Sequence, residues 1–113
     1  MTRYFIRLPV PTLARGAEPE LSFQSVGAEG LANELQNALQ CDQLFQRWRS
    51  MQEEPDDIDA SIGAADPDAR VSGAQSDLAI DLVVNTKLSS SILRQRLRWL
   101  AGSHWELRDV TAG

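Results

Sequence analysis

The stretch Leu78-Ala79-Ile80-Asp81-Leu82-Val83-Val84 decides the fold of this 113-residue chain. Large aliphatic residues occupy every second position of it, which is the pattern of a β-strand with one buried face. We expect this strand to lie at the centre of a sheet, and the rest of the chain is interpreted around it.

Three other segments alternate in the same way. Residues 3–8 and 104–110 each predict a strand, and a shorter alternation over 20–26 predicts a further one. Pro9 and Pro11 end the first of these strands, because proline has no N–H to donate to a sheet. The intervening residues 9–19 are therefore expected to form a loop.

Two segments carry apolar residues at intervals of three and four, which is the spacing of a helix with one buried face. The first covers 29–52 and predicts one helix about 36 Å long that ends before Pro55. The second covers 92–101, with serines directly before it that can cap the helix N-terminus. Gly102 follows it, at the position where a left-handed residue commonly ends a helix.

Strands separated by helices in a chain of this length predict a single α+β domain over 1–113. The expected architecture is a ferredoxin-like open sheet of about four strands with two helices packed on one face. Residues 53–76 are acidic and rich in Ala, Gly, Ser and Pro, which predicts a long acidic, mobile or partly ordered loop. The alternative for this loop is a short strand hidden at 58–62.

Bulk composition excludes several classes of protein. The chain has a mass of 12.5 kDa and a formal net charge of −5, and its apolar runs are far too short to cross a bilayer. Arg7 interrupts the only apolar stretch near the start, so no secretory signal is expected. With one cysteine, these features favour a cytoplasmic location and no membrane partner. Ten of the eleven basic residues are arginine, which suggests a bacterial coding background.

Charge is distributed unevenly along the chain. Residues 53–85 hold nine carboxylates and one arginine, whereas 86–113 hold five basic and two acidic side chains. Arg94, Arg96 and Arg98 cluster on the second predicted helix. The acidic middle repels nucleic acid over much of the surface, so nucleic-acid binding through this helix is the weakest functional alternative.

An open sheet with helices on one side leaves its other side uncovered. The residues expected there are too apolar for water, and self-association or partner binding is the usual remedy. The predicted partner-binding residues, with two arginines of the second helix, are Phe5, Ala79, Asp81, Val83, Trp105, Arg94 and Arg98.

Two segments contain residue types that bind ions. The first is an anion-binding candidate at a predicted helix N-terminus, formed by Lys87, Ser89, Ser90 and Ser91. It lacks a glycine-rich turn, so ordinary N-capping explains these serines better. The second, Asp57 to Asp68, resembles the start of a calcium loop, but Ile62 stands where glycine is required and Asp68 replaces the bidentate glutamate. No metal site is predicted.

No catalytic or cofactor-binding motif is present. His104 is the only histidine, and Cys41 lies on the apolar stripe of the first helix, where it is expected to be a buried packing residue. The sequence therefore favours a non-enzymatic interaction or regulatory domain that forms a homodimer or binds a protein partner through the open sheet face. The alternative is a small-molecule-binding or catalytic dimeric α+β barrel that uses His104 or Asp81.

Overall fold

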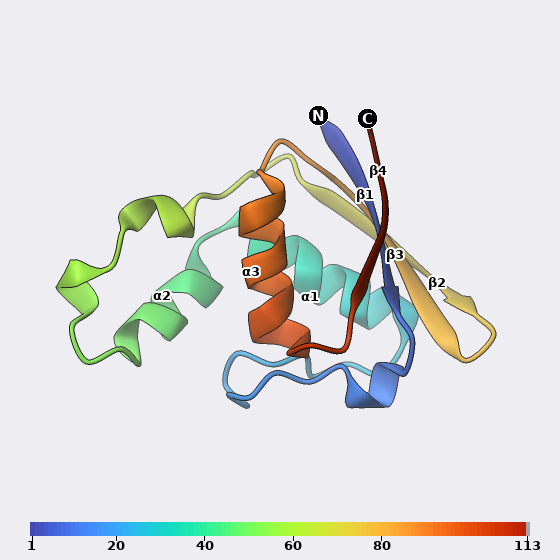
Figure 1. Ribbon diagram of the computed structural model, residues 1–113, viewed down its shortest axis with the longest axis horizontal. Helices are drawn as coiled ribbons and strands as arrows, with labels where there is room; N and C mark the ends of the chain where they lie inside the picture. The colour runs from blue at the N-terminus through green and yellow to red at the C-terminus, as the bar shows by residue number, and fades with distance from the viewer. Residues whose placement is uncertain (113) are drawn as a thin grey trace.

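The protein is an α+β domain built on a four-stranded antiparallel open sheet with three α-helices (Figure 1). The computed structural model describes residues 1–112. The strands are β1 (Thr2–Leu8), β2 (Arg70–Ser76), β3 (Ala79–Thr86) and β4 (Glu106–Ala112), in the order β2-β3-β1-β4. The helices are α1 (Ala28–Gln40), α2 (Gln43–Ser50) and α3 (Ser90–Ala101).

The core lies between one face of the sheet and the helices α1 and α3, which lie on the same side of the sheet in Figure 1. The alternation predicted for the central strand is confirmed, since every second residue of β3 from Ile80 to Thr86 is buried. The largest fully buried aliphatic side chains come from strands and helices alike: Ile6, Leu8, Ile80, Leu82, Val84, Leu31, Leu35, Leu39, Leu93 and Leu97. The opposite side of the sheet is called the outer face below.

The predicted boundaries of the last helix are confirmed. The Ser89 hydroxyl accepts a hydrogen bond from the Ile92 N–H at 3.4 Å and so caps the N-terminus of α3. Gly102 follows the helix with a φ of +65°, a backbone conformation that favours glycine. These local signals place α3 where the sequence predicts it.

The single long helix predicted over 29–52 is wrong, because the structure contains two helices there. In a continuous helix, the carbonyl of Ala38 would accept the N–H of Asp42. Instead, it accepts Nε–H of Arg96, a buried residue of α3, at 3.3 Å. A guanidinium at a helix C-terminus also stabilises the negative end of the helix dipole. The tertiary contact therefore takes the place of a helical hydrogen bond, and Cys41 and Asp42 separate α1 from α2.

The strand predicted over 20–26 is also wrong. Leu21 and Phe23 are buried, but the segment forms turns and irregular backbone, and the N–H of Phe23 donates to the Leu100 carbonyl at 2.9 Å. The alternation arises because the two side chains are buried in the core while the backbone of the segment bonds to the end of α3, outside the sheet.

The predicted loop over 53–76 contains a strand in its second half. The alternative, a short strand at 58–62, is wrong, because these residues lead into the 3₁₀ turn Ala60–Gly63. The strand in this part of the chain is β2, which begins at Arg70. Only Val71 of β2 is buried, so this edge strand has no apolar alternation to reveal it.

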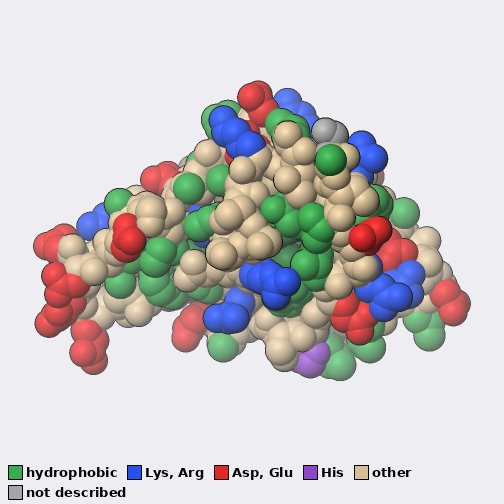
Figure 2. Space-filling model, turned by 45° about the horizontal axis from the view of Figure 1, so that its top comes forward, with side chains coloured by type: hydrophobic (Ala, Val, Ile, Leu, Met, Phe, Trp, Pro, Cys, Tyr) green, Lys and Arg blue, Asp and Glu red, His purple; other side chains and the backbone are tan. Residues whose placement is uncertain are grey.

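Residues 43–65, called the arm below, project from the domain at the left of Figure 1. The arm contains α2 and two 3₁₀ turns, and acidic side chains gather at its far end in Figure 2. Its exposed carboxylates are Glu53, Glu54, Asp56, Asp57 and Asp59.

Candidate functional site

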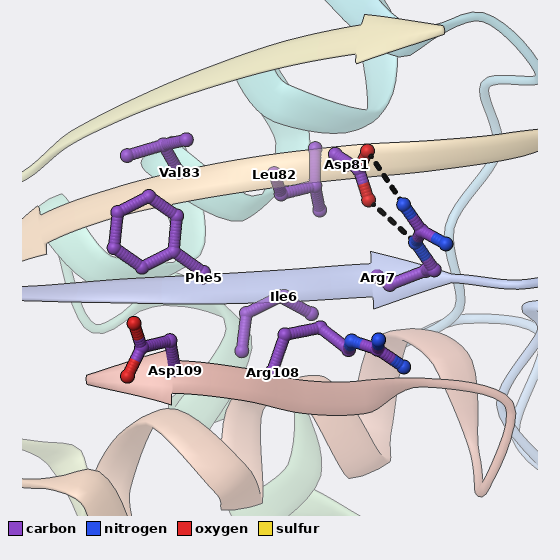
Figure 3. A pocket seen from close by; sticks show the side chains of 8 residues that line it. All are labelled: Phe5, Ile6, Arg7, Asp81, Leu82, Val83, Arg108 and Asp109. Atoms are coloured by element: carbon purple, nitrogen blue, oxygen red, sulfur yellow. Dashed lines mark hydrogen bonds and ion pairs between the residues drawn. The ribbon is translucent and has the colours of Figure 1, made fainter. Parts of the chain in front are cut away.

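The centre of the outer face is formed by two adjacent strands. The register of β1 against β3 places Phe5 opposite Val83, and Arg7 opposite Asp81. All four side chains are half-buried, because each is covered only by its neighbours on the sheet. Figure 3 shows them side by side above the ribbon.

Arg7 and Asp81 form a bidentate ion pair across the two strands. Nε of Arg7 lies 2.8 Å from Oδ1 of Asp81, and Nη2 lies 3.1 Å from Oδ2. The hydrogen bond from Arg7 lowers the pKa of the Asp81 carboxyl; partial burial opposes this shift, and the charge of Arg7 adds to it. Asp81 is therefore held ionised, which makes it a weak proton acceptor at neutral pH.

The edge strand β4 adds charged side chains to the same face. Its register against β1 shifts between Phe5 and Ile6, and Arg108 is the extra residue of this bulge. As a result, Arg108 and its neighbour Asp109 both line the outer face. Nη1 of Arg108 also lies 3.1 Å from the Glu106 carboxylate.

A shallow hollow of about 340 Å³ opens on this face. It is lined by Phe5, Ile6, Arg7, Asp81, Leu82, Val83, Arg108 and Asp109. A second hollow of about 350 Å³ shares Arg7 and Arg108 with it and continues to the β2–β3 turn. The two hollows make one groove that runs along the strands from Phe5 and Val83 to the β2–β3 turn.

Leu78 stands at the end of this groove and is 82% exposed. The sequence pattern places it on the buried side with Ile80, and that expectation is wrong. β3 begins at Ala79, and Asp77 has a φ of +59° in the turn, so Leu78 lies outside the strand and its alternation. Leu78 can be assigned to a turn only when β2 is recognised as the strand that precedes it, because Asp77 and Leu78 connect β2 to β3.

The predicted partner-binding residues are divided between two sides of the molecule. Phe5, Asp81 and Val83 line the first hollow, and Ala79 lines the second. Trp105, predicted on the same face, precedes β4 and packs against the core, and its indole N–H donates to the Gly102 carbonyl at 3.0 Å.

The three arginines of α3 do not form one basic surface. Arg94 and Arg98 are exposed, whereas Arg96 is fully buried. Because α3 covers the inner side of the sheet, Arg94 and Arg98 do not line the groove. Two separate arginines are a weak electrostatic footprint for nucleic acid.

Of the predicted anion-binding residues, only Lys87 contacts an anionic group, and that group is a carboxylate of the chain itself. Asp66 is fully buried and accepts the Thr86 hydroxyl at 2.8 Å and the Lys87 N–H at 3.0 Å. Burial raises its pKa. These two hydrogen bonds, a third from the Asp68 N–H and the charge of Lys87 together lower the pKa by more than burial raises it, so the net shift is downward. Ser89, Ser90 and Ser91 are exposed at the start of α3. Sequence reasoning missed Asp66 because nothing in its neighbourhood distinguishes it from the exposed acids.

The two other chemically reactive side chains lie away from the groove. His104 is exposed between α3 and β4 and lines neither hollow. Cys41, expected to be buried, is half-buried beyond the end of α1, and its Sγ lies 3.3 Å from the Asn37 carbonyl oxygen.

Among residues 1–112, no group of three or more His, Cys, Asp or Glu side chains is placed to hold a metal ion. None of the helices that the structure describes is long and apolar enough to cross a bilayer. No protein-family model, curated protein or solved structure matches this chain.

Proposed function

We propose that this protein is a non-enzymatic interaction domain that pairs with a second copy of itself through the outer face. The observation that carries the proposal is the groove, in which Phe5 and Val83 lie next to the Arg7–Asp81 pair and Leu78 stands exposed at one end. Apolar side chains rimmed by charged ones on an exposed face are typical of interaction surfaces.

We propose further that the fold is ferredoxin-like. The element order supports this, since β1 and β2 are separated by helices, β2 and β3 form a hairpin, and β3 and β4 are separated by α3. The strand order β2-β3-β1-β4 and the placement of α1 and α3 on one side agree with it. This arrangement leaves the outer face available to a partner.

Charge favours a second copy as the partner. The chain has a net charge of −5, so two copies repel each other over most of their surfaces. The outer face is an exception, because the register gives it residues of both signs in nearly equal number: Arg3, Arg7, Arg70, Arg108, Asp81, Glu106 and Asp109. Two such faces related by a two-fold axis can bring arginines of one copy against carboxylates of the other.

The size of the face predicts a weak dimer. Seven-residue strands are about 23 Å long, and four of them span about 19 Å, which is a footprint of about 440 Å². A partner in a stable interface of standard size buries about 800 Å². Leu78 and the β2–β3 turn extend the face, but we expect a dissociation constant on the order of 10 µM or weaker.

Sedimentation velocity over a concentration series from about 5 µM to about 500 µM tests the proposal. We expect a reversible monomer–dimer equilibrium that Leu78→Asp weakens about tenfold or more, since a buried aliphatic contact is replaced by a charge. Val26→Asp is the matched control, because Val26 is 72% exposed and lines neither hollow, and it should leave the equilibrium unchanged. A protein that stays monomeric throughout, or equal effects of the two variants, would contradict the proposal.

A small-molecule-binding dimer is a second candidate, and the hollow of about 340 Å³ favours it. This volume is at the lower end of the range for ligand pockets, and a facing copy would enclose it. The lowered pKa of Asp81 and the position of His104 favour binding over proton transfer. Chemical shift changes at Phe5 and Val83 on addition of a small-molecule library would support this candidate, and changes confined to other residues would contradict it.

A further inference from the structure

The base of the arm is joined by one buried side chain. Arg96 of α3 donates from Nε to the Ala38 carbonyl at 3.3 Å and from Nη2 to the Ala64 carbonyl at 3.0 Å. Ala38 precedes the arm and Ala64 is near its end, so a single guanidinium connects the two stems.

The chain on either side of the arm is held together by separate bonds. The Asp66 N–H donates to the Leu39 carbonyl at 2.8 Å, and Nε2 of Gln40 donates to the Ala69 carbonyl at 2.9 Å. These bonds lie outside residues 43–65. They can persist whatever position the arm takes.

The arm has packing of its own. A Cβ on Gly63 would lie 2.5 Å from the Phe45 ring, so the 3₁₀ turn Ala60–Gly63 is packed directly against α2. Arg49 and Asp56 form an ion pair at 3.6 Å within the arm. These contacts hold the arm together as one unit.

An aromatic stack adds to the contact between arm and domain. The Trp48 ring of α2 stacks on Trp99 of α3 with centroids 5.0 Å apart, and the Arg96 guanidinium lies 5.1 Å from the Trp99 centroid. α2 itself buries only Leu44 and Phe45. These two residues belong to the same buried cluster as Trp99, so Arg96 and Trp48 add a polar and an aromatic contact to the apolar packing that ties the arm to the domain.

The position of the arm in this structure, called the closed position below, carries an electrostatic penalty. Arg96 is fully buried, and its Nη1 has no hydrogen-bond partner within the part of the chain that the structure describes. Its bonded partners are neutral carbonyls, and the charge of the nearby Asp42 offsets only part of the cost of burying the guanidinium, because burial lowers the Arg96 pKa overall. Moving the arm away would return Arg96 to water, so the closed and open positions differ less in free energy than their contacts suggest.

We propose that the arm is a strap that detaches from the domain as a unit about residues 41–42 and 65, with Arg96 as the clamp that holds it closed. Once detached, the eight-residue α2 is too short to keep its helical hydrogen bonds, so its amides become open to exchange. Opening uncovers Trp99 and the apolar side of α3 and leaves the sheet intact. The strap is independent of the pairing proposed for the outer face, because α3 lies on the other side of the sheet.

Amide hydrogen exchange of the full chain, followed peptide by peptide in mass spectrometry, tests the strap. In the unaltered protein we expect peptides within 43–64 to exchange at least tenfold faster than those of β1 and β3. Arg96→Met should accelerate exchange in the arm by a further tenfold or more and leave β1 and β3 unchanged, because it removes both donated hydrogen bonds. Arg94→Met is the matched control on an exposed position of α3, and it should change neither region.

Trp48→Ala keeps the proposal testable if Arg96→Met does not fold. It removes the stack on Trp99 without touching Arg96, and we expect the same selective acceleration in the arm. Arm and sheet exchanging together in the unaltered protein would overturn the strap, because opening would then require global unfolding. The proposal would also be overturned if both variants accelerated amide exchange in the arm and in the sheet equally. It would likewise be overturned if neither variant accelerated exchange in the arm.

Discussion

Asp66→Asn should lower the free energy of unfolding by about 2–3 kcal/mol, the range for hydrogen bonds to a buried charged group. Both carboxylate oxygens of Asp66 accept: Oδ2 from the Thr86 hydroxyl and the Lys87 N–H, and Oδ1 from the Asp68 N–H. An amide offers only one acceptor oxygen. Whichever way Asn lies, its NH₂ group faces at least one donor and leaves it unsatisfied in a buried site.

Urea unfolding at neutral pH measures this loss. With a slope of about 1.5 kcal/mol per M for a chain of this size, the midpoint should fall by about 1.3–2 M. Asp68→Asn is the control, because Asp68 is exposed and its part in the cluster is its backbone N–H, which the substitution keeps. An unchanged midpoint for Asp66→Asn, or equal losses in the two variants, would refute the role assigned to the buried carboxylate.

The same comparison has a predicted pH dependence. The pKa of Asp66 is lowered from 3.8 in the folded protein, so its contribution to stability is fully present above about pH 4. It is lost as the pH falls through the lowered folded-state pKa. The difference between the unaltered protein and Asp66→Asn should therefore shrink below pH 4, and a difference that stays constant to pH 2 would contradict this assignment.

Two further predictions concern packing. Leu82→Ala, at a fully buried position in the central strand, should cost about 3–4 kcal/mol, whereas Leu78→Ala in the exposed turn should change stability by less than about 0.5 kcal/mol. Similar losses in calorimetry would show that Leu78 is part of the core. Gly16→Ala should destabilise by about 2 kcal/mol or more, because the added Cβ would lie 2.0 Å from the Trp99 carbonyl oxygen; an unchanged melting temperature would disprove this close approach.

The elements that follow local rules could be predicted from the sequence. β1 and β3 alternate because one face of each is buried, and α3 has both its capping serine and a C-terminal glycine. Such signals are contained in a few neighbouring residues. They place the centre of the sheet and its last helix within about two residues.

The candidate site could be predicted only in part. Phe5, Asp81 and Val83 follow from alternation on two recognised strands. Leu78 was placed on the wrong side, because its exposure depends on a turn to the edge strand β2. Arg108 and Asp109 line the groove together because a bulge shifts the register of β4, and no sequence pattern marked that bulge.

By itself, the sequence determined the alternating strands and the capped helix, since the spacing of apolar residues and the chemistry of helix caps act over short distances. The tertiary structure decided which polar residues are interior. Arg96 looked like one of three surface arginines, and Asp66 like one of many loop acids. Both are fully buried, and both bond to residues 20 or more positions away along the chain, Asp66 to Thr86 and Arg96 to Ala64, which only folding brings within reach.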